Sequence, residues 1–345
     1  MPRLPSPRLP SLRRALAPLV LVALFAAACG AGGASSTDGT SSTSKSTSGA
    51  PAASGEWSAE ALGREAQAAP VTPIVINSIL GVGTNRVLIA LFTKDQQLIA
   101  DATNAQLRLF SLEGDRGLQV SEHALTPSHM PAESTIHPHA DGAQHLHDAA
   151  GVTAYATTLE LPRSAFWGAE VSFVQGGRQY RQRLRFAVQP STPHPAIGAS
   201  VPPSVQKTLR DGIPLADLDT SAVPRPELHE LTIAEAVANG KPTVIAFATP
   251  AFCQTRLCGP VVEKVVVPAA QKYGARINTL HIEPFEVPAA RTGVLKTEAV
   301  LLEWGLETEP WVFVLGKDGR VRDKFEGIVS PEELLAAIDR ALAAG

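Results

Sequence analysis

Apolar and polar residues alternate along several short segments in the N-terminal part of the chain. The alternation runs through residues 105–112, 152–161, 169–175 and 180–188. Turn-forming residues such as Gly176-Gly177 separate these segments. Short alternating strands at regular spacing are typical of an antiparallel sandwich, which we therefore expect over residues 71–189.

This sandwich is expected to be of the immunoglobulin-like kind. It contains no cysteine pair, so burial of apolar side chains must hold it together. Trp167, in the phrase AFWGAEV, is the residue that we expect to fill the space between its two sheets.

From residue 228 onward the pattern changes to alternating helices and strands. Helical periodicity covers residues 231–240, 258–274, 294–306 and 331–344, with a kink expected at Pro268. Apolar runs at 243–249 and 276–284 predict strands, and 311–327 predicts a hairpin. The predicted order is α-β-α-β-α-β-β-α, an α/β domain over residues 228–345.

Two cysteines, Cys253 and Cys258, lie at the start of the second of these helices, in ATPAFCQTRLCGP. Residues five apart on a regular helix point about 140° away from each other. Two such thiols could not form a disulfide, which needs Cα atoms about 4.4–6.8 Å apart. If they pair, residues 253–257 must form a loop and the helix must begin near Cys258.

The C-terminal third of the chain resembles the thioredoxin fold. A strand runs into a cysteine-bearing helix start (VIAFATPAFC), Pro310 precedes the final hairpin, and an amphipathic helix closes the chain. The phrase TPAFC…CGP behind a β domain is also similar to bacterial lipoproteins of thioredoxin-like type. The usual two residues between the cysteines are replaced by the four of C-Q-T-R-L-C.

The resemblance implies a redox site. Cys253 would be the nucleophile, Cys258 the resolving thiol, and Pro310 a cis proline packed against them. The alternatives are a static disulfide between Cys253 and Cys258, or metal binding by both thiols. A loop this short removes little chain entropy when it is closed, so stability alone is a weak reason for the pair.

The N-terminus predicts export and lipid attachment. Residues 1–28 combine four arginines with a thirteen-residue apolar stretch from Leu16, too short for a membrane span. Small residues then precede Cys29, as in a bacterial lipobox, and residues 29–70 begin with a Gly/Ser/Thr-rich tether. We expect a lipid-anchored protein of the cell envelope, outside the cytoplasm, where a Cys253–Cys258 disulfide can persist.

Six of the nine histidines fall within a proposed insertion at 123–147 of the sandwich. The phrase HPHADGAQHLH is symmetric about Gly142, so a hairpin would set His137 opposite His147 and His139 opposite His145. Four converging imidazoles would suit copper or zinc, but an Asp-Gly turn prefers a two-residue loop, which would separate the pairs. The alternatives are solvent-facing histidines that bind metal only opportunistically, or that have no role.

The net charge of −3 does not suggest a nucleic-acid surface. A proline-rich connector is expected over residues 190–227. Three functions remain open: a membrane-anchored thiol–disulfide oxidoreductase that needs no cofactor and acts on protein thiols or disulfides, a copper- or zinc-handling protein, and a non-catalytic interaction module.

Overall fold

The computed structural model describes residues 56–58, 70–114, 116–138, 144–149 and 151–344. Within these residues the chain is rich in antiparallel β-sheet and has few helices. The helices of the described residues are all too short or too polar to cross a membrane.

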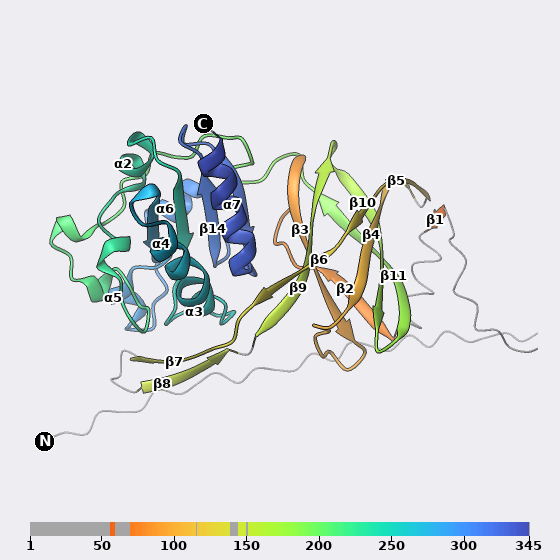
Figure 1. Ribbon diagram of the computed structural model, residues 1–345, viewed down its shortest axis with the longest axis horizontal. Coiled ribbons are helices and arrows are strands. Elements are labelled where there is room, and N and C mark those ends of the chain that lie inside the picture. Colours follow the sequence, from red (N-terminus) through yellow and green to blue (C-terminus); the bar gives the residue numbers. More distant parts are fainter. Residues whose placement is uncertain (1–55, 59–69, 115, 139–143, 150, 345) are drawn as a thin grey trace, which may run out of the picture. The chain divides into compact units, whose positions relative to one another are not determined.

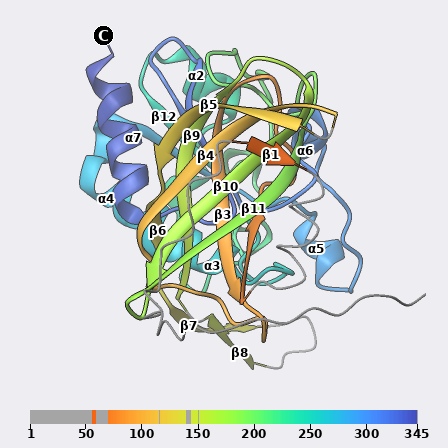
Figure 2. The ribbon, with the colours of Figure 1, turned by 90° about the vertical axis from the view of Figure 1, so that its right-hand side faces the viewer.

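The N-terminal part forms two antiparallel sheets (Figure 1). Figure 2 shows β5, β4, β10 and β11 side by side in the larger sheet. The five-stranded sheet has the order β1 (Glu56–Ser58), β5 (Arg116–Ala124), β4 (Thr103–Glu113), β10 (Ala165–Gln175) and β11 (Arg178–Val188). The four-stranded sheet has the order β2 (Val71–Val75), β3 (Gly83–Thr93), β9 (Val152–Leu161) and β6 (Thr126–Met130).

These two sheets pack face to face through one apolar cluster. Trp167 of β10 is 2% exposed within this cluster and confirms the predicted core position. Its indole N–H donates to the carbonyl of Arg163 at 3.2 Å. The hydroxyl of Tyr155, on β9, accepts from the amide of Ala102 at 2.8 Å. The polar atoms of these two buried aromatic side chains therefore each have a partner, as burial requires.

The C-terminal part contains a four-stranded sheet of order β13-β12-β14-β15. Strand β12 runs parallel to β13 and antiparallel to β14, which pairs with β15. Every residue of β12 and β14 is buried, as the continuous apolar runs predicted. The strand bounds are Thr243–Phe247 (β12), Asn278–Ile282 (β13), Trp311–Leu315 (β14) and Val321–Glu326 (β15).

The helices agree with the predicted positions except in length. The first is α2 (Ile233–Ala238) and the closing helix is α7 (Pro331–Ala343), where the Ser330 side chain accepts from the amide of Glu333. The helix predicted over 294–306 is shorter, since α6 spans only Ala299–Trp304. Residues 296 and 298 instead hydrogen-bond to the main chain of residues 286 and 284, near the short helix α5 (Val287–Ala290).

The helix that carries Cys258 is continuous but not uniform. It consists of α3 (Cys258–Pro260), a π-helical stretch η4 (Val261–Val266) and α4 (Val267–Tyr273). Pro268 has no amide to donate to the preceding turn, so an α-helical bond there cannot form. A widened turn directly before this proline takes the place of the predicted kink.

The segment 190–227 does more than connect, which corrects the prediction of an extended linker. It contains the short 3₁₀-helices η1 (Leu209–Asp211) and η2 (Leu215–Asp217) and ends at η3 (Pro226–Leu228). Polar side chains from it are buried against the C-terminal part: the hydroxyl of Ser204 accepts from the indole of Trp304 at 3.2 Å. Hydrogen bonds to the C-terminal part, rather than the high proline content of the segment, therefore determine the course of residues 190–227.

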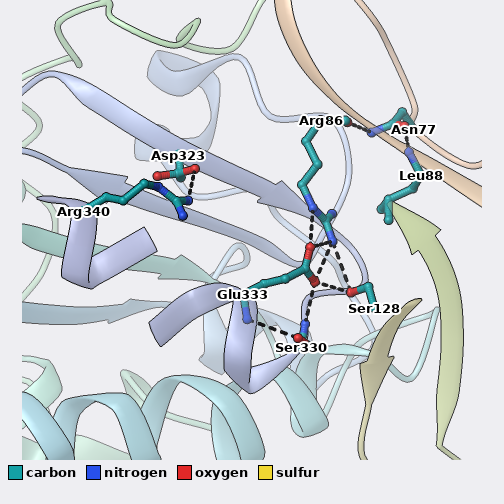
Figure 3. Close-up of polar contacts among 8 residues, drawn as sticks. All are labelled: Asn77, Arg86, Leu88, Ser128, Asp323, Ser330, Glu333 and Arg340. Carbon is teal, nitrogen blue, oxygen red and sulfur yellow. Dashed lines mark hydrogen bonds and ion pairs between the residues drawn. The ribbon is translucent and has the colours of Figure 1, made fainter. Parts of the chain in front are cut away.

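An ion pair joins β3 to α7 (Figure 3). The guanidinium of Arg86 donates to the Glu333 carboxylate through Nε at 3.0 Å and Nη2 at 2.8 Å. The hydroxyl of Ser128 donates to the same carboxylate. Leu88 and Met130 lie in one apolar cluster with residues of α7 and β15. One face of the sheet β2-β3-β9-β6 packs against the five-stranded sheet, and its other face is thus covered by residues of the C-terminal part.

Replacing Glu333 by Ala should destabilise the protein by about 2–4 kcal/mol, because Arg86 keeps a largely buried charge and α7 loses its capping contact. Urea unfolding followed by circular dichroism measures this. Glu332→Ala, on the exposed side of the same turn, is the control and should change the free energy of unfolding by less than about 0.5 kcal/mol. Equal effects of the two substitutions would contradict the importance of the ion pair.

Candidate redox site

Cys253 and Cys258 lie between the end of β12 and the start of α3. Residues 250–256 form turns and bends, and the helix begins at Cys258, as the five-residue spacing predicted. Arg256 has φ of 60°, in the left-handed region that few non-glycine residues adopt. This conformation lets the loop turn back toward the first cysteine.

The sulfur of Cys253 is hydrogen-bonded to two groups near it in the sequence. The amide of Cys258 donates to it at 3.3 Å, and the hydroxyl of Thr255 lies 3.2 Å away. Both cysteines are free thiols in the structure. The amide is the first of the helix, so the positive end of the helix faces the sulfur.

The two thiols have opposite acidities. The hydrogen bond with the Cys258 side chain lowers the pKa of Cys253 to about 6, against the effect of burial, and Thr255 adds to it. Burial raises the pKa of Cys258 well above its usual value, and the hydrogen bond and charge of Cys253 raise it further. At neutral pH the site therefore holds one thiolate, half-buried, beside one fully buried thiol. This is the division that a nucleophile and a resolving thiol require.

Pro310 begins at a cis peptide bond with Glu309, directly before β14. Burial, and after it the charge of Cys253, raises the pKa of Glu309 to about 7. The carboxyl group of Glu309 thus belongs to the surroundings of the nucleophile. The sequence pattern pointed to Pro310 as a site residue but not to Glu309, although the two are adjacent.

A cluster of buried ionisable side chains lies on the side of the sheet that the cysteine-bearing helix covers. Asp219 accepts from Nε2 of His229 at 3.1 Å, and Nδ1 of His281 lies 3.5 Å from its other carboxylate oxygen. Nε2 of His281 donates to the carbonyl of Ala248 at 2.9 Å. Glu283 accepts the amide and hydroxyl of Thr220 at 2.8 and 2.7 Å.

Burial alone would raise the pKa of Asp219, but the charge of His281 and hydrogen bonds from His229 and others hold it well below its usual range. The same pairing raises the pKa of His281 to about 9 despite burial. Burial raises the pKa of Glu283 to about 7. The cluster was not predicted as a unit. One signal was present: His281 and Glu283 are two apart in a buried strand and so share a face.

Three other side chains near the cysteines have distinct surroundings. Trp311 is 3% exposed, and its indole N–H donates to the hydroxyl of Thr308 at 3.0 Å, so it belongs to the core. Glu263 is half-buried, and burial raises its pKa. Arg256 is exposed and is not among the causes of the lowered Cys253 pKa.

The predicted pairing of His137 with His147 is wrong, because the register of the hairpin differs from the expected one. The hairpin of β7 (Glu133–Pro138) and β8 (Gln144–Ala149) places His137 opposite His145, and His147 opposite Thr135. His139 lies outside the described residues. His123 and His129 belong to β5 and β6, so the inserted hairpin is shorter than the predicted 123–147 segment.

The predicted signal segment, the lipidated Cys29 and the beginning of the tether lie outside the described residues. They remain predictions from the sequence.

Comparison with known proteins gives little guidance. No family model matches the chain, and no curated protein matches it. Among solved structures, a thioredoxin-family thiol:disulfide interchange protein from Chlorobium tepidum TLS shares 14% identity at a TM-score of 0.26, over 44% of this chain and 98% of its own. A family 123 glycoside hydrolase from Clostridium perfringens shares 11% identity at a TM-score of 0.19, over 32% of this chain and 22% of its own. Both likenesses are weak, and we base no argument on them.

The alkylation rate of the reduced protein by iodoacetamide should rise as pH increases through about 6, because only the thiolate form of Cys253 reacts. Thr255→Val should move this midpoint upward, since it removes a group that lowers the pKa. Thr292→Val, at an exposed position elsewhere, is the control. A midpoint near the ordinary cysteine value of about 8.5 in the unsubstituted protein would contradict the assigned acidity.

Proposed function

We propose that residues 228–345 form a thioredoxin-like domain and that the protein is a membrane-anchored, extracytoplasmic thiol–disulfide oxidoreductase. The observation that carries the proposal is the unequal acidity of two adjacent thiols, with the sulfur of Cys253 held by the Cys258 amide. The order of strand, cysteine loop and helix, and the cis bond before Pro310, support it. The predicted lipid anchor at Cys29 supplies the location.

The reaction starts from the thiolate of Cys253. It attacks one sulfur of a substrate disulfide, forms a mixed disulfide, and releases the other substrate sulfur as a thiolate that takes up a proton. Cys258 then loses its proton and attacks the Cys253 sulfur, which releases the second substrate thiol. Two electrons pass to the substrate and the protein is left with a 253–258 disulfide. Thiols of a partner protein restore the dithiol, and the reverse sequence oxidises a substrate.

The exposure of the two thiols indicates which of them attacks the substrate first. Cys253 is partly exposed, so a protein disulfide can approach it, whereas Cys258 has no exposed surface. The buried thiol reaches only the sulfur beside it. Its high pKa also keeps it protonated, and so unreactive, until the mixed disulfide has neutralised Cys253.

Cys253→Ser should abolish disulfide exchange, measured as reduction of a peptide disulfide in the presence of excess dithiothreitol. Cys258→Ser should instead accumulate the mixed disulfide, visible by mass spectrometry as a covalent adduct on Cys253. The two variants each remove one thiol, so each controls for the other. Exchange by the Cys253→Ser variant at the rate of the unsubstituted protein would exclude the proposal.

A second candidate function, metal handling, is favoured by the hairpin register. Residues directly opposite on antiparallel strands share a face, as do residues two apart on one strand. His137, His145 and His147 therefore occupy three positions on one face of the β7–β8 hairpin. Histidine is a residue type that binds copper and zinc.

If this face binds metal, His137→Ala/His145→Ala should weaken Cu²⁺ binding at least tenfold by isothermal titration calorimetry, with the cysteines alkylated beforehand. His123→Ala/His129→Ala is the control, because these histidines lie on β5 and β6. Equal Cu²⁺ affinity in both double variants would rule out the hairpin as the site.

A further inference from the structure

The buried cluster around Asp219 brings together three segments that are distant in the sequence. Asp219 comes from the 190–227 segment, His229 follows the short helix η3, and His281 lies on β13. The side chains of all three are at most 3% exposed. One donor atom from each lies within 4.8 Å of the others.

The spacing of the donor atoms suits a small divalent cation. Zinc binds nitrogen and oxygen ligands at about 2.0–2.1 Å in tetrahedral geometry, which separates two ligand atoms by about 3.3 Å. Nε2 of His229 lies 3.1 Å from Oδ2 of Asp219, and Nδ1 of His281 lies 3.5 Å from the other oxygen, Oδ1.

Additional hydrogen bonds to His281 and Asp219 orient these side chains, as such bonds do at known metal sites. Nε2–H of His281 donates to the carbonyl of Ala248, so that its Nδ1 is directed at the carboxylate, where no well-formed hydrogen bond satisfies it. Each oxygen of Asp219 also accepts one backbone amide, from Ser221 and from Arg225, both at 2.8 Å. Metal-binding imidazoles and carboxylates are commonly held by such second partners.

The neighbourhood of the cluster offers a fourth ligand. A cavity of about 30 Å³ is lined by His229, His281 and Glu283, large enough for one water molecule. Glu283 itself has a buried carboxylate oxygen, Oε2, with no hydrogen-bond partner among the described residues. A divalent cation would balance the charges of Asp219 and Glu283 while both imidazoles stay neutral.

We infer that Asp219, His229 and His281 form a structural zinc site that fastens the 190–227 segment and η3 to strand β13. Two imidazole nitrogens and one carboxylate oxygen are a donor set that zinc accepts together with a water molecule in the fourth position, and the buried location would admit the ion during folding rather than afterwards. The inference is independent of the thiol chemistry, since it uses neither cysteine.

The test starts from a full-length chain in which the ligands of the other metal sites considered above are removed: Cys253→Ser/Cys258→Ser with His137, His139, His145 and His147 changed to Ala. This parent variant is refolded from urea with Zn²⁺, freed of loose metal by gel filtration, and its zinc content measured by mass spectrometry. We expect about one zinc ion per chain, as a single site holds. A folded parent variant without zinc would overturn the inference.

Further substitutions in this parent variant locate the site. His281→Gln and His229→Gln should each weaken zinc binding at least tenfold, whereas His194→Gln, a buried histidine outside the cluster, should leave it unchanged. Should the ligand variants fail to fold, Co²⁺ in the parent variant gives a second readout. Intense visible absorption typical of four-coordinate Co²⁺ supports the site, and a six-coordinate spectrum excludes it. Because this parent variant has no dithiol, its zinc content is unaffected by whether the proposed oxidoreductase activity exists.

Discussion

The hydrogen bond from the Cys258 amide to the Cys253 sulfur is the contact on which the proposed chemistry depends. A four-residue gap would separate the thiols on a regular helix, so the loop must bring the first sulfur back to the start of the helix. Once there, the sulfur lies at the positive end of the helix and its negative form is stabilised. The hydrogen bond with the Cys258 side chain is the largest cause of the lowered Cys253 pKa, and burial is the largest cause of the raised Cys258 pKa, so the two halves of the asymmetry have separate causes within one loop.

The surrounding fold keeps this loop in place from three sides. Strand β12, buried along its full length, fixes the residues before the loop, and the continuous helix from Cys258 to Tyr273 fixes those after it. The cis bond between Glu309 and Pro310 begins the neighbouring strand β14. Ala248 packs in one apolar cluster with Cys258, and its carbonyl accepts from His281 of the buried cluster around Asp219. The 190–227 segment is therefore part of the support of the site.

Features set by neighbouring residues were predictable from the sequence. The apolar run of β12, the loop ending at Cys258, and the amphipathic closing helix α7 each depend on nearby positions, and all three occur as expected. Features set by distant partners were not predictable. Arg86 meets Glu333 across 247 positions, and Asp219 meets His281 only when a proline-rich segment folds back onto the sheet.

The histidine hairpin shows a different limit of sequence reasoning. The symmetric phrase predicted a hairpin centred on Gly142. The observed register is shifted by two residues, so that His137 lies opposite His145 rather than His147. Similarly, helical periodicity after residue 294 could not reveal that residues 296 and 298 bond to the 284–286 main chain instead. In both cases local patterns describe what a segment can do, and longer-range hydrogen bonds decide what it does.

The reduction potential of the Cys253–Cys258 pair tests the central claim most directly. The protein is equilibrated with glutathione buffers of graded potential, and the fraction of free thiol is read from the mass added by alkylation. An exchanging dithiol should titrate between about −120 and −270 mV, the range of known thiol–disulfide exchangers. A potential far below about −300 mV would mark a structural disulfide and contradict the proposed activity.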